Sequence, residues 1–232
     1  MKIIQQQTKH FGYVYVENLY TKKELHSIKN ELQNINYIFD SVPAIQEQRT
    51  RMSGKYEDYS PKMTGNGMML DAVYSQRDYS SILTFDRKIF GNSIEEKFEE
   101  THPSNVAYSR INKDFTVLNR YSYGHQYGTH YDLSSFSALT FFSLSEKEML
   151  GGELIFTDYD ISFKFVDNFC VIFPSWVQHH ATKVESKDVF RFNFISMMLY
   201  PRWENNTEVV RKLKGDIIIS KNQLPSYHFL FT

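Results

Sequence analysis

The chain has 232 residues, a formal net charge of −1 and a sequence pI of about 6.7. This length fits one domain with a full hydrophobic core, and the near-neutral charge argues against a nucleic-acid-binding surface. There is neither a cationic leader followed by an apolar segment nor a run of about 18 apolar residues, so we expect a soluble, cytoplasmic protein with no membrane contact. The 19 Phe and 16 Tyr residues favour strands and predict a β-rich core.

The N-terminal segment predicts one strand followed by a helix. Residues 12–16 alternate between apolar and other side chains, as strands do. Thr21 and Glu24 have the spacing of a capping box, which marks the start of a helix. Apolar residues then follow at helical spacing and predict a helix of about four turns that packs on a sheet: Leu25, Ile28, Leu32 and Ile35.

The next segment is divided between a long loop and a helical region. Residues 41–68 contain two prolines, three glycines and many charges, which predicts an irregular loop. Loops of this length act as lids or substrate-recognition elements, or they are solvated insertions, and the sequence leaves both readings open. Residues 70–104 have a helical apolar pattern that includes Val73, Ile82 and Phe98.

From residue 115 to 200 the pattern changes to short apolar strands separated by turn residues. Such spacing predicts a sandwich or barrel, and a double-sheet jelly roll is the antiparallel option that we favour, because it can hold a metal between its sheets. The expected strands are 116–123, 138–144, 153–156, 161–166, 170–173 and 190–199. Residues after 200 predict a helix near 208–213 and a strand at 217–219.

A candidate metal site begins at His130 and Asp132, which are two residues apart after a glycine-containing turn. On one strand, side chains at positions i and i+2 point to the same face and could converge on one cation. Two histidines and one carboxylate form a ligand set that suits non-haem Fe(II) with open coordination positions. The pair therefore needs a second histidine from another segment.

His179 and His180 are the candidates for that third ligand, and on a strand only one of them can face the metal. The spacing to Trp176 and Val184 favours His179, with His180 as the alternative. Arg191 follows inside a strand of aromatic residues. Arginine is seldom buried without a partner, and an organic dicarboxylate is a natural partner because guanidinium binds carboxylate in a fork.

The order of these motifs resembles that of the Fe(II)- and 2-oxoglutarate-dependent oxygenases, and it is most similar to the prolyl 4-hydroxylase-like branch with its bacterial and viral members. The resemblance covers residues 115–200 or so and rests on several matches in the family's order. Besides His130-x-Asp132, His179 and Arg191, they are Asn119-Arg-Tyr121, Gly124, Tyr127-Gly128, Thr140-Phe-Phe-Ser-Leu144, Gly151-Gly-Glu-Leu-Ile-Phe156 and Phe173-Pro-Ser-Trp176.

The resemblance implies a role for each matching position. The Fe(II) ligands would be His130, Asp132 and His179. Arg191 would bind the distal carboxylate of 2-oxoglutarate, with Tyr121 and Thr140 as further cosubstrate-binding residues. Because the carboxylate ligand is retained at Asp132, the resemblance points to hydroxylation rather than halogenation.

The resemblance also implies an activity, namely hydroxylation of an unactivated C–H bond with O2 and release of succinate and CO2. Peptidyl proline is the expected substrate, and ascorbate is allowed as an accessory cofactor. Two alternatives stay open: the same chemistry on a free amino acid, a small metabolite or a nucleic-acid base, and a metal-binding jelly roll without turnover. We expect a single oxygenase domain over residues 1–232, with a catalytic core at 115–200 between an N-terminal part (1–114) and a C-terminal extension (201–232).

Overall fold

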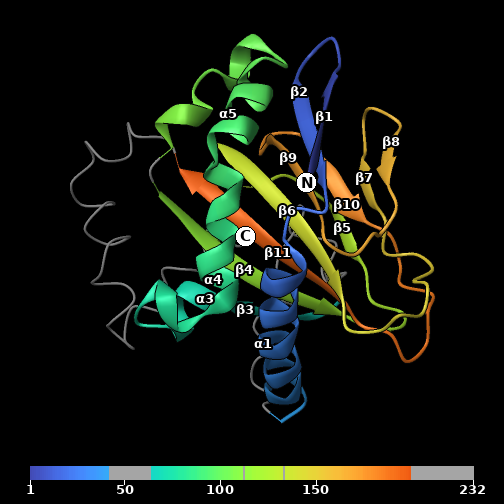
Figure 1. Cartoon of the computed structure of the whole chain (residues 1–232). Coiled ribbons are helices and arrows are strands. Elements are labelled where there is room, and N and C mark those ends of the chain that lie inside the picture. Colours follow the sequence, from blue (N-terminus) through green and yellow to red (C-terminus); the bar gives the residue numbers. More distant parts are fainter. Residues whose placement is uncertain (42–63, 112, 133, 200–232) are drawn as a thin grey trace, which may run out of the picture.

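The computed structural model describes residues 1–41, 64–111, 113–132 and 134–199. Within these residues the chain forms two antiparallel sheets and several helices. The helices cover one side of the larger sheet, and the smaller sheet lies on its other side (Figure 1). The expectation of a mainly β fold with flanking helices is therefore confirmed.

The larger sheet has seven strands in the order β1-β2-β9-β6-β11-β4-β3. Every residue of its two central strands, β6 and β11, is buried. Because successive side chains of a strand point to opposite faces, these strands supply one core on each side of the sheet. The strands are β1 (Lys2–Gln7), β2 (Gly12–Glu17), β3 (Asn66–Met69), β4 (Lys113–Tyr121), β6 (Phe136–Ser143), β9 (Phe169–Pro174) and β11 (Arg191–Leu199).

The smaller sheet has four short strands in the order β5-β10-β7-β8. Its residues Phe156 and Phe163 pack in one buried cluster with Leu139 and Val171 of the larger sheet. We call this cluster the inner core, because it fills the space between the two sheets. The strands are β5 (Tyr127–His130), β7 (Leu154–Phe156), β8 (Ile161–Phe163) and β10 (His179–Ala181).

A long helix and a series of short ones cover the opposite face, which we call the outer face of the larger sheet. They bury a second cluster that includes Ile28 and Leu32 of α1, Ile82 and Leu83 of α4, and Phe194 of β11. The helices are α1 (Lys22–Ser41), α3 (Leu70–Val73), α4 (Ser81–Asp86) and α5 (Asn92–Glu99), with the 3-10 turns η1 (Arg77–Tyr79), η2 (Arg87–Phe90), η3 (Pro103–Asn105) and η4 (Tyr108–Arg110).

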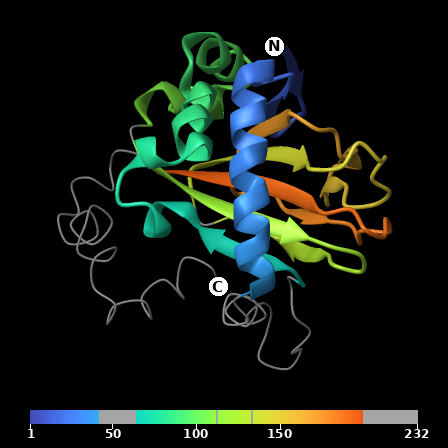
Figure 2. The ribbon, with the colours of Figure 1, turned by 60° about the horizontal axis from the view of Figure 1, so that its bottom comes forward.

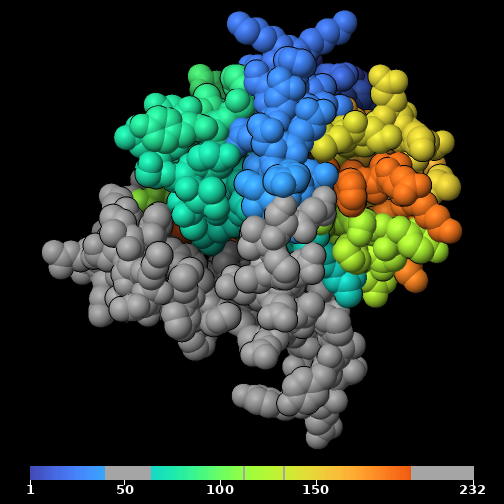
Figure 3. Space-filling model, turned by 90° about the horizontal axis from the view of Figure 1, so that it is seen from below, coloured from blue at the N-terminus to red at the C-terminus, as the bar shows by residue number. Residues whose placement is uncertain are grey.

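Helix α1 begins as the capping box predicts. The backbone N–H of Thr21 donates to the Glu24 carboxylate at 2.7 Å, and the N–H of Glu24 donates to the Thr21 hydroxyl at 3.4 Å. The helix then crosses in front of the strands of the larger sheet (Figure 2). Seen from below, its blue atoms lie between the teal-green region of the short helices and the yellow, orange and lime regions of the later chain (Figure 3).

Two predictions for the segment before β4 are wrong in part. The loop expected over 41–68 ends early, because residues 66–69 form β3 on the edge of β4; residues 42–63, with the proposed lid, lie outside the described residues. The helical region expected over 70–104 is divided into short helices, because Ser80 caps a new one: its hydroxyl accepts the N–H of Leu83 at 3.1 Å. Val73, expected on the apolar face, is exposed.

Some predictions reach beyond the described residues. The helix near 208–213 and the strand at 217–219 lie outside them, and the single domain over 1–232 stays a prediction. Among the helices that the structure describes, none is both long enough and apolar enough to cross a membrane.

Candidate metal centre

Two histidines meet because their strands are paired. His130 is the last residue of β5 and His179 is the first residue of β10, and the two are direct partners in the β5–β10 register. Directly opposed residues of an antiparallel pair carry their side chains side by side. Their ring centroids lie 4.3 Å apart, although 49 positions separate the residues in the sequence.

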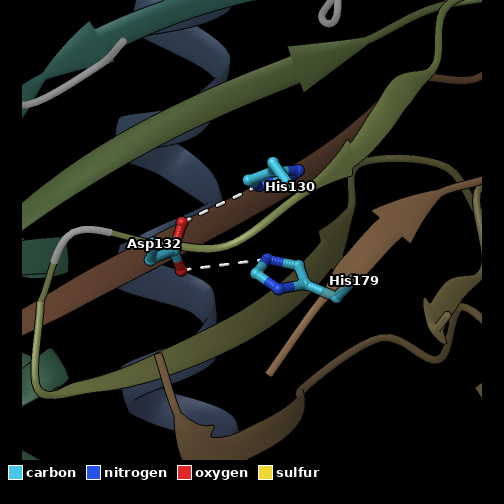
Figure 4. A group of neighbouring side chains, drawn as sticks. All are labelled: His130, Asp132 and His179. Carbon is cyan, nitrogen blue, oxygen red and sulfur yellow. Dashed lines mark ion pairs between the residues drawn. The ribbon is translucent and has the colours of Figure 1, made fainter. Parts of the chain in front are cut away.

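Asp132 completes the group from just beyond the strand. The assumption that His130 and Asp132 share one strand is wrong, because β5 ends at His130, and the N–H of Asp132 instead donates to the carbonyl oxygen of Ser175 at 3.0 Å. The carboxylate nevertheless faces both rings, with one oxygen directed toward each of them (Figure 4). Its Oδ1 is 3.7 Å from Nε2 of His130, and its Oδ2 is 3.8 Å from Nε2 of His179.

Backbone carbonyls fix which nitrogen of each ring faces the aspartate. Nδ1 of His130 lies 2.8 Å from the carbonyl oxygen of Gly128, and Nδ1 of His179 lies 2.9 Å from that of Val177. A carbonyl oxygen only accepts hydrogen bonds, so each Nδ1 carries a proton. In the neutral rings both Nε2 lone pairs therefore point toward Asp132, which is the arrangement of metal-binding histidines.

A chain of serine hydroxyls holds the Asp132 carboxylate. The Ser137 hydroxyl donates to Oδ2 at 2.6 Å, and the Ser175 hydroxyl lies 2.7 Å from that of Ser137. Ser134 extends the chain, with its hydroxyl 2.7 Å from that of Ser175. Sequence analysis missed Ser137; the signal was a lone serine in the otherwise apolar start of β6.

The donor set fits a divalent metal. One nitrogen from each histidine and one carboxylate oxygen lie within 4.8 Å of one another, and the three side chains are nearly buried. Two imidazoles and one carboxylate with open positions are the set that suits non-haem Fe(II). This is the one such group of histidine, cysteine and acidic side chains in the described part of the chain.

Aromatic side chains keep the two imidazoles in place. Tyr127 stacks on His130 with a centroid separation of 3.8 Å, and Phe173 packs edge-on against His179 at 5.0 Å. His180, the alternative ligand, is not part of the group; its Nδ1 lies 3.0 Å from the Thr157 hydroxyl. The structure thus brings His179, and not His180, to His130 and Asp132.

Arg191 is buried a short way along the same inner face, at the start of β11. It is 1% exposed, and its guanidinium carbon lies 4.9 Å from the ring centroids of both Tyr121 and Phe141. Burial lowers the pKa of Arg191 to about 10, an effect partly offset by Tyr121, so the side chain stays charged at neutral pH. Its Nε has no hydrogen-bond partner, and no acidic side chain pairs with it among the described residues.

One pocket is lined by the arginine and by two of the candidate metal ligands, His130 and His179. Leu139, Leu154 and Ile195 form apolar walls, which limit the access of water to the polar groups. His180 and Ala181 also border the pocket. The remaining lining residues are Tyr121, Tyr127, His130, His179, Arg191 and Asn193.

Thr140 does not lie in this pocket. It is buried on the outer face of β6, on the same side as Ala138 and Phe142, whereas Leu139 faces the pocket. Its neighbours there include Tyr20 and Cys170. The expected cosubstrate role does not fit this position, because strand alternation turns residue 140 away from the site.

Asn193 is a pocket residue that sequence analysis missed. It is 2% exposed, and its Oδ1 is buried without a partner. The signal was its position two residues after Arg191, which places it on the same strand face. Tyr121 also lines the pocket, and it is the direct partner of Arg191 in the β4–β11 register.

The comparisons with known proteins rest on structure rather than on sequence. No family model matches the chain, and no curated protein matches it in sequence. A prolyl-4-hydroxylase from Pseudomonas putida superposes with a TM-score of 0.54 at 12% identity, over 82% of this chain and 93% of that protein.

Two further solved structures are of the same kind. A prolyl hydroxylase from Trichoplax adhaerens, in complex with a peptide fragment of the hypoxia inducible factor oxygen degradation domain, gives a TM-score of 0.50 at 10% identity, over 84% of this chain and 86% of that one. A viral collagen prolyl hydroxylase from Paramecium bursaria Chlorella virus-1 gives 0.46 at 13% identity, over 80% and 96%. The two prolyl hydroxylases with TM-scores of 0.54 and 0.50 show that the chain has the same fold as these enzymes.

Proposed function

We propose that the protein is an Fe(II)- and 2-oxoglutarate-dependent dioxygenase that hydroxylates an unactivated C–H bond, most suitably in a peptidyl proline. The iron ligands are His130, Asp132 and His179. Arg191 binds the distal carboxylate of 2-oxoglutarate, and Tyr121 lies beside it. The two facing sheets that enclose the site support a jelly-roll core.

The observation that carries the proposal is the buried charge of Arg191. An isolated ion in a protein interior costs several kcal/mol unless a counter-charge is close by. No acidic side chain of the described chain supplies that counter-charge, and the guanidinium lies in the pocket that the metal ligands line. A dicarboxylate from solution satisfies this arginine, because guanidinium and carboxylate form strong, charge-assisted hydrogen bonds.

In this proposal, residues of the chain bind the metal and fix the orientation of its ligands. Asp132 supplies negative charge to the metal, and its serine partner holds the carboxylate in one orientation. The carbonyl-bound Nδ1 atoms leave Nε2 of both imidazoles aimed at the metal. When bound, iron and 2-oxoglutarate would supply the oxidising chemistry, in which O2 is consumed, succinate and CO2 are released and a C–H bond gains a hydroxyl.

The substrate is the finer part of the proposal. The Trichoplax structure of the same fold holds a peptide, which favours a peptide or protein substrate here. A free amino acid, a small metabolite or a nucleic-acid base is the alternative, and the net charge of −1 weakens the nucleic-acid version, because phosphate contacts dominate such binding.

The activity is tested by measuring succinate. Purified protein is incubated with Fe(II), 2-oxoglutarate, O2 and ascorbate, the last as an accessory reductant, and with one of three substrate pools: proline-containing peptides, free amino acids or oligonucleotides. Succinate is expected to rise with the peptide pool, with a product heavier by one oxygen atom in mass spectrometry. Asp132→Ala is expected to abolish both signals.

Two other outcomes assign the protein differently. A product in another pool would keep the chemistry and change the substrate. A rise in the melting temperature with metal, but none with 2-oxoglutarate or its analogues and no succinate in any pool, would favour a metal-binding jelly roll without turnover. The proposal fails if no pool yields succinate and His130→Ala changes nothing.

A further inference from the structure

The Arg191 side chain is enclosed on several sides before any ligand binds. Its guanidinium carbon lies 4.9 Å from the centroids of the Tyr121 and Phe141 rings. Its aliphatic stem lies against the backbone of Gly152, in the turn before β7. Another side of the side chain borders the pocket.

Gly152 leaves no room for a side chain at this contact. A Cβ at position 152 would lie 2.9 Å from Cδ of Arg191, 3.6 Å from its Nε and 3.3 Å from Cγ2 of Val184. A contact of 2.9 Å between carbon atoms forces one of the groups to move, because van der Waals contact begins at about 3.5 Å.

The turn that holds Gly152 is attached on its other side, so the backbone is not the part that can yield. The N–H of Gly152 donates to the carbonyl oxygen of Lys183 at 3.1 Å, and Gly151 forms an isolated antiparallel bridge with Val184. A Cβ at Gly151 would lie 2.0 Å from the Lys183 carbonyl oxygen. The arginine is therefore the group that a side chain at position 152 would displace.

We infer that Gly152 is a positioning residue for Arg191: the absence of a side chain at position 152 sets where the guanidinium stands in the pocket, and hence how tightly the pocket binds the distal carboxylate of a dicarboxylate. This inference rests on the proposed function. It gives the Gly-Gly turn a role beyond its positive φ angles of 72° and 69°.

Gly124 provides a matched control. Its φ is 85°, so alanine there carries a similar backbone strain, and its N–H likewise donates to the 183–184 segment, to the Val184 carbonyl oxygen at 2.8 Å. The nearest atom to a Cβ at Gly124 is Cε of Lys183 at 4.0 Å, an ordinary van der Waals contact that requires no group to move. Gly152→Ala and Gly124→Ala thus share the strain, and only the first meets Arg191.

The first measurement is the dissociation constant for 2-oxoglutarate, by isothermal titration calorimetry on the Mn(II)-loaded protein, in which no turnover occurs. Gly152→Ala is expected to weaken 2-oxoglutarate binding about tenfold or more, because small misplacements of a binding group are costly. Gly124→Ala is expected to stay within about twofold of the wild type, and the Mn(II) affinity of both variants is expected to be unchanged. Equal 2-oxoglutarate affinity in Gly152→Ala and the wild type would overturn the inference.

The second measurement is the melting temperature, and it tests the inference even if Gly152→Ala is poorly stable. The Arg191→Ala variant lacks the side chain that Gly152→Ala is expected to displace. In the Arg191→Ala background, Gly152→Ala and Gly124→Ala are therefore expected to lower the melting temperature by the same amount. An equal loss with and without Arg191 would overturn the inference. If the wild type binds no 2-oxoglutarate, the proposed function fails, while this thermal cycle still decides the contact between Gly152 and Arg191.

Discussion

Two buried arginines on neighbouring strands of the larger sheet have opposite surroundings. Arg120 of β4 is 5% exposed and lies on the outer face, where it donates to Asn66 Oδ1 through Nε at 3.2 Å and through Nη2 at 3.0 Å. Its Nη1 donates to Asn36 Oδ1 at 2.8 Å. Arg191 of β11 is 1% exposed and faces the pocket, and its Nε has no partner.

This difference indicates that the charge of Arg120 stabilises the fold, whereas the charge of Arg191 is suited to binding a ligand. Arg120 ties α1 and β3 to β4 through side-chain acceptors of the chain itself. Arg191 packs on aromatic rings, which attract a cation but do not replace an anion. A buried donor that the chain leaves unsatisfied is costly, so its presence in a pocket beside a metal-binding group indicates a ligand.

The acidic side chains on the two faces of the larger sheet differ in the same way, because among the described residues only those on the outer face are paired with arginines. On the outer face, Asp114 is paired with Arg77 and Arg87, and Asp71 is paired with Arg77. On the inner face, Asp132 has the Ser137 hydroxyl and two imidazoles, but no arginine or lysine pairs with it in the described part of the chain. The inner face thus keeps a cation and an anion apart, each free to bind a group from solution.

Replacing each arginine by methionine tests this comparison with the largest expected effect. Arg191→Met is expected to weaken 2-oxoglutarate binding on the order of a hundredfold, because it removes charge-assisted hydrogen bonds to the ligand, while stability changes by less than about 1 kcal/mol or rises. Arg120→Met is expected to cost about 2–4 kcal/mol of stability, because it leaves buried amide groups unpaired. Urea unfolding and calorimetric titration measure the two effects, and the reverse pattern would contradict the assignment.

A smaller effect is expected at Ser137, whose hydroxyl donates to the Asp132 carboxylate. Ser137→Ala removes the hydroxyl that donates to Asp132 and is expected to weaken Fe(II) binding by about 10- to 100-fold. Ser134→Ala is the control, because Ser134 reaches Ser175 without touching the carboxylate. Anaerobic Fe(II) titration compares the two variants, and equal affinities would show that the hydroxyl does not orient Asp132.

The pH dependence of the free energy of unfolding tests the environment of Asp86, which is buried on the outer face. Burial raises its pKa from 3.8 to about 6, although hydroxyl groups of Ser196 and Thr116 donate to it. Because the folded-state pKa is the higher one, the stabilisation is complete below pH 3.8 and is lost as pH rises through 6. The loss is on the order of 3 kcal/mol at most.

The measurement is urea unfolding of the wild type and of Asp86→Asn across this pH range. The wild type is expected to lose stability relative to the variant as pH rises from 4 to 7, since asparagine carries no titrating proton there. Parallel stability curves would mean that Asp86 ionises in the folded protein as readily as in the unfolded chain.

The smallest effect is expected at Thr140. Its hydroxyl faces away from the pocket and has no hydrogen-bond partner of good geometry. Thr140→Val keeps the shape, so the 2-oxoglutarate affinity is expected to be unchanged and the stability to change by less than about 1 kcal/mol. A loss of 2-oxoglutarate affinity in calorimetry would restore Thr140 to the site.

Local patterns predicted much of this structure because their causes are local. The capping box at Thr21, the alternating strand 12–16 and the apolar strand 190–199 depend on neighbouring residues alone. The long helical stretch over 70–104 failed because helix breaks at Ser80 and Gly91 compete with the apolar periodicity. Strand β3 has no apolar alternation of its own and forms by pairing with β4.

The residues of the candidate site could be predicted from their order in the sequence, but their arrangement in space depends on strand pairing. His130, Asp132, His179 and Arg191 follow a recognisable spacing, whereas the register that places His179 opposite His130 arises only when β5 and β10 pair. Thr140 was named from the resemblance alone, which does not specify the face of β6 on which residue 140 lies; successive residues of a strand point to opposite faces.

The central claim is that one Fe(II) is held by a group that includes His179 and excludes its neighbour His180. Anaerobic titration of Fe(II), with 2-oxoglutarate present, into His179→Ala and His180→Ala tests it most directly, because the two variants differ by one position on the same strand. His180→Ala is expected to bind a single Fe(II) per chain with nearly the wild-type affinity, and His179→Ala is expected to lose this binding. Loss in His180→Ala with retention in His179→Ala, or retention in both, would contradict the site described here.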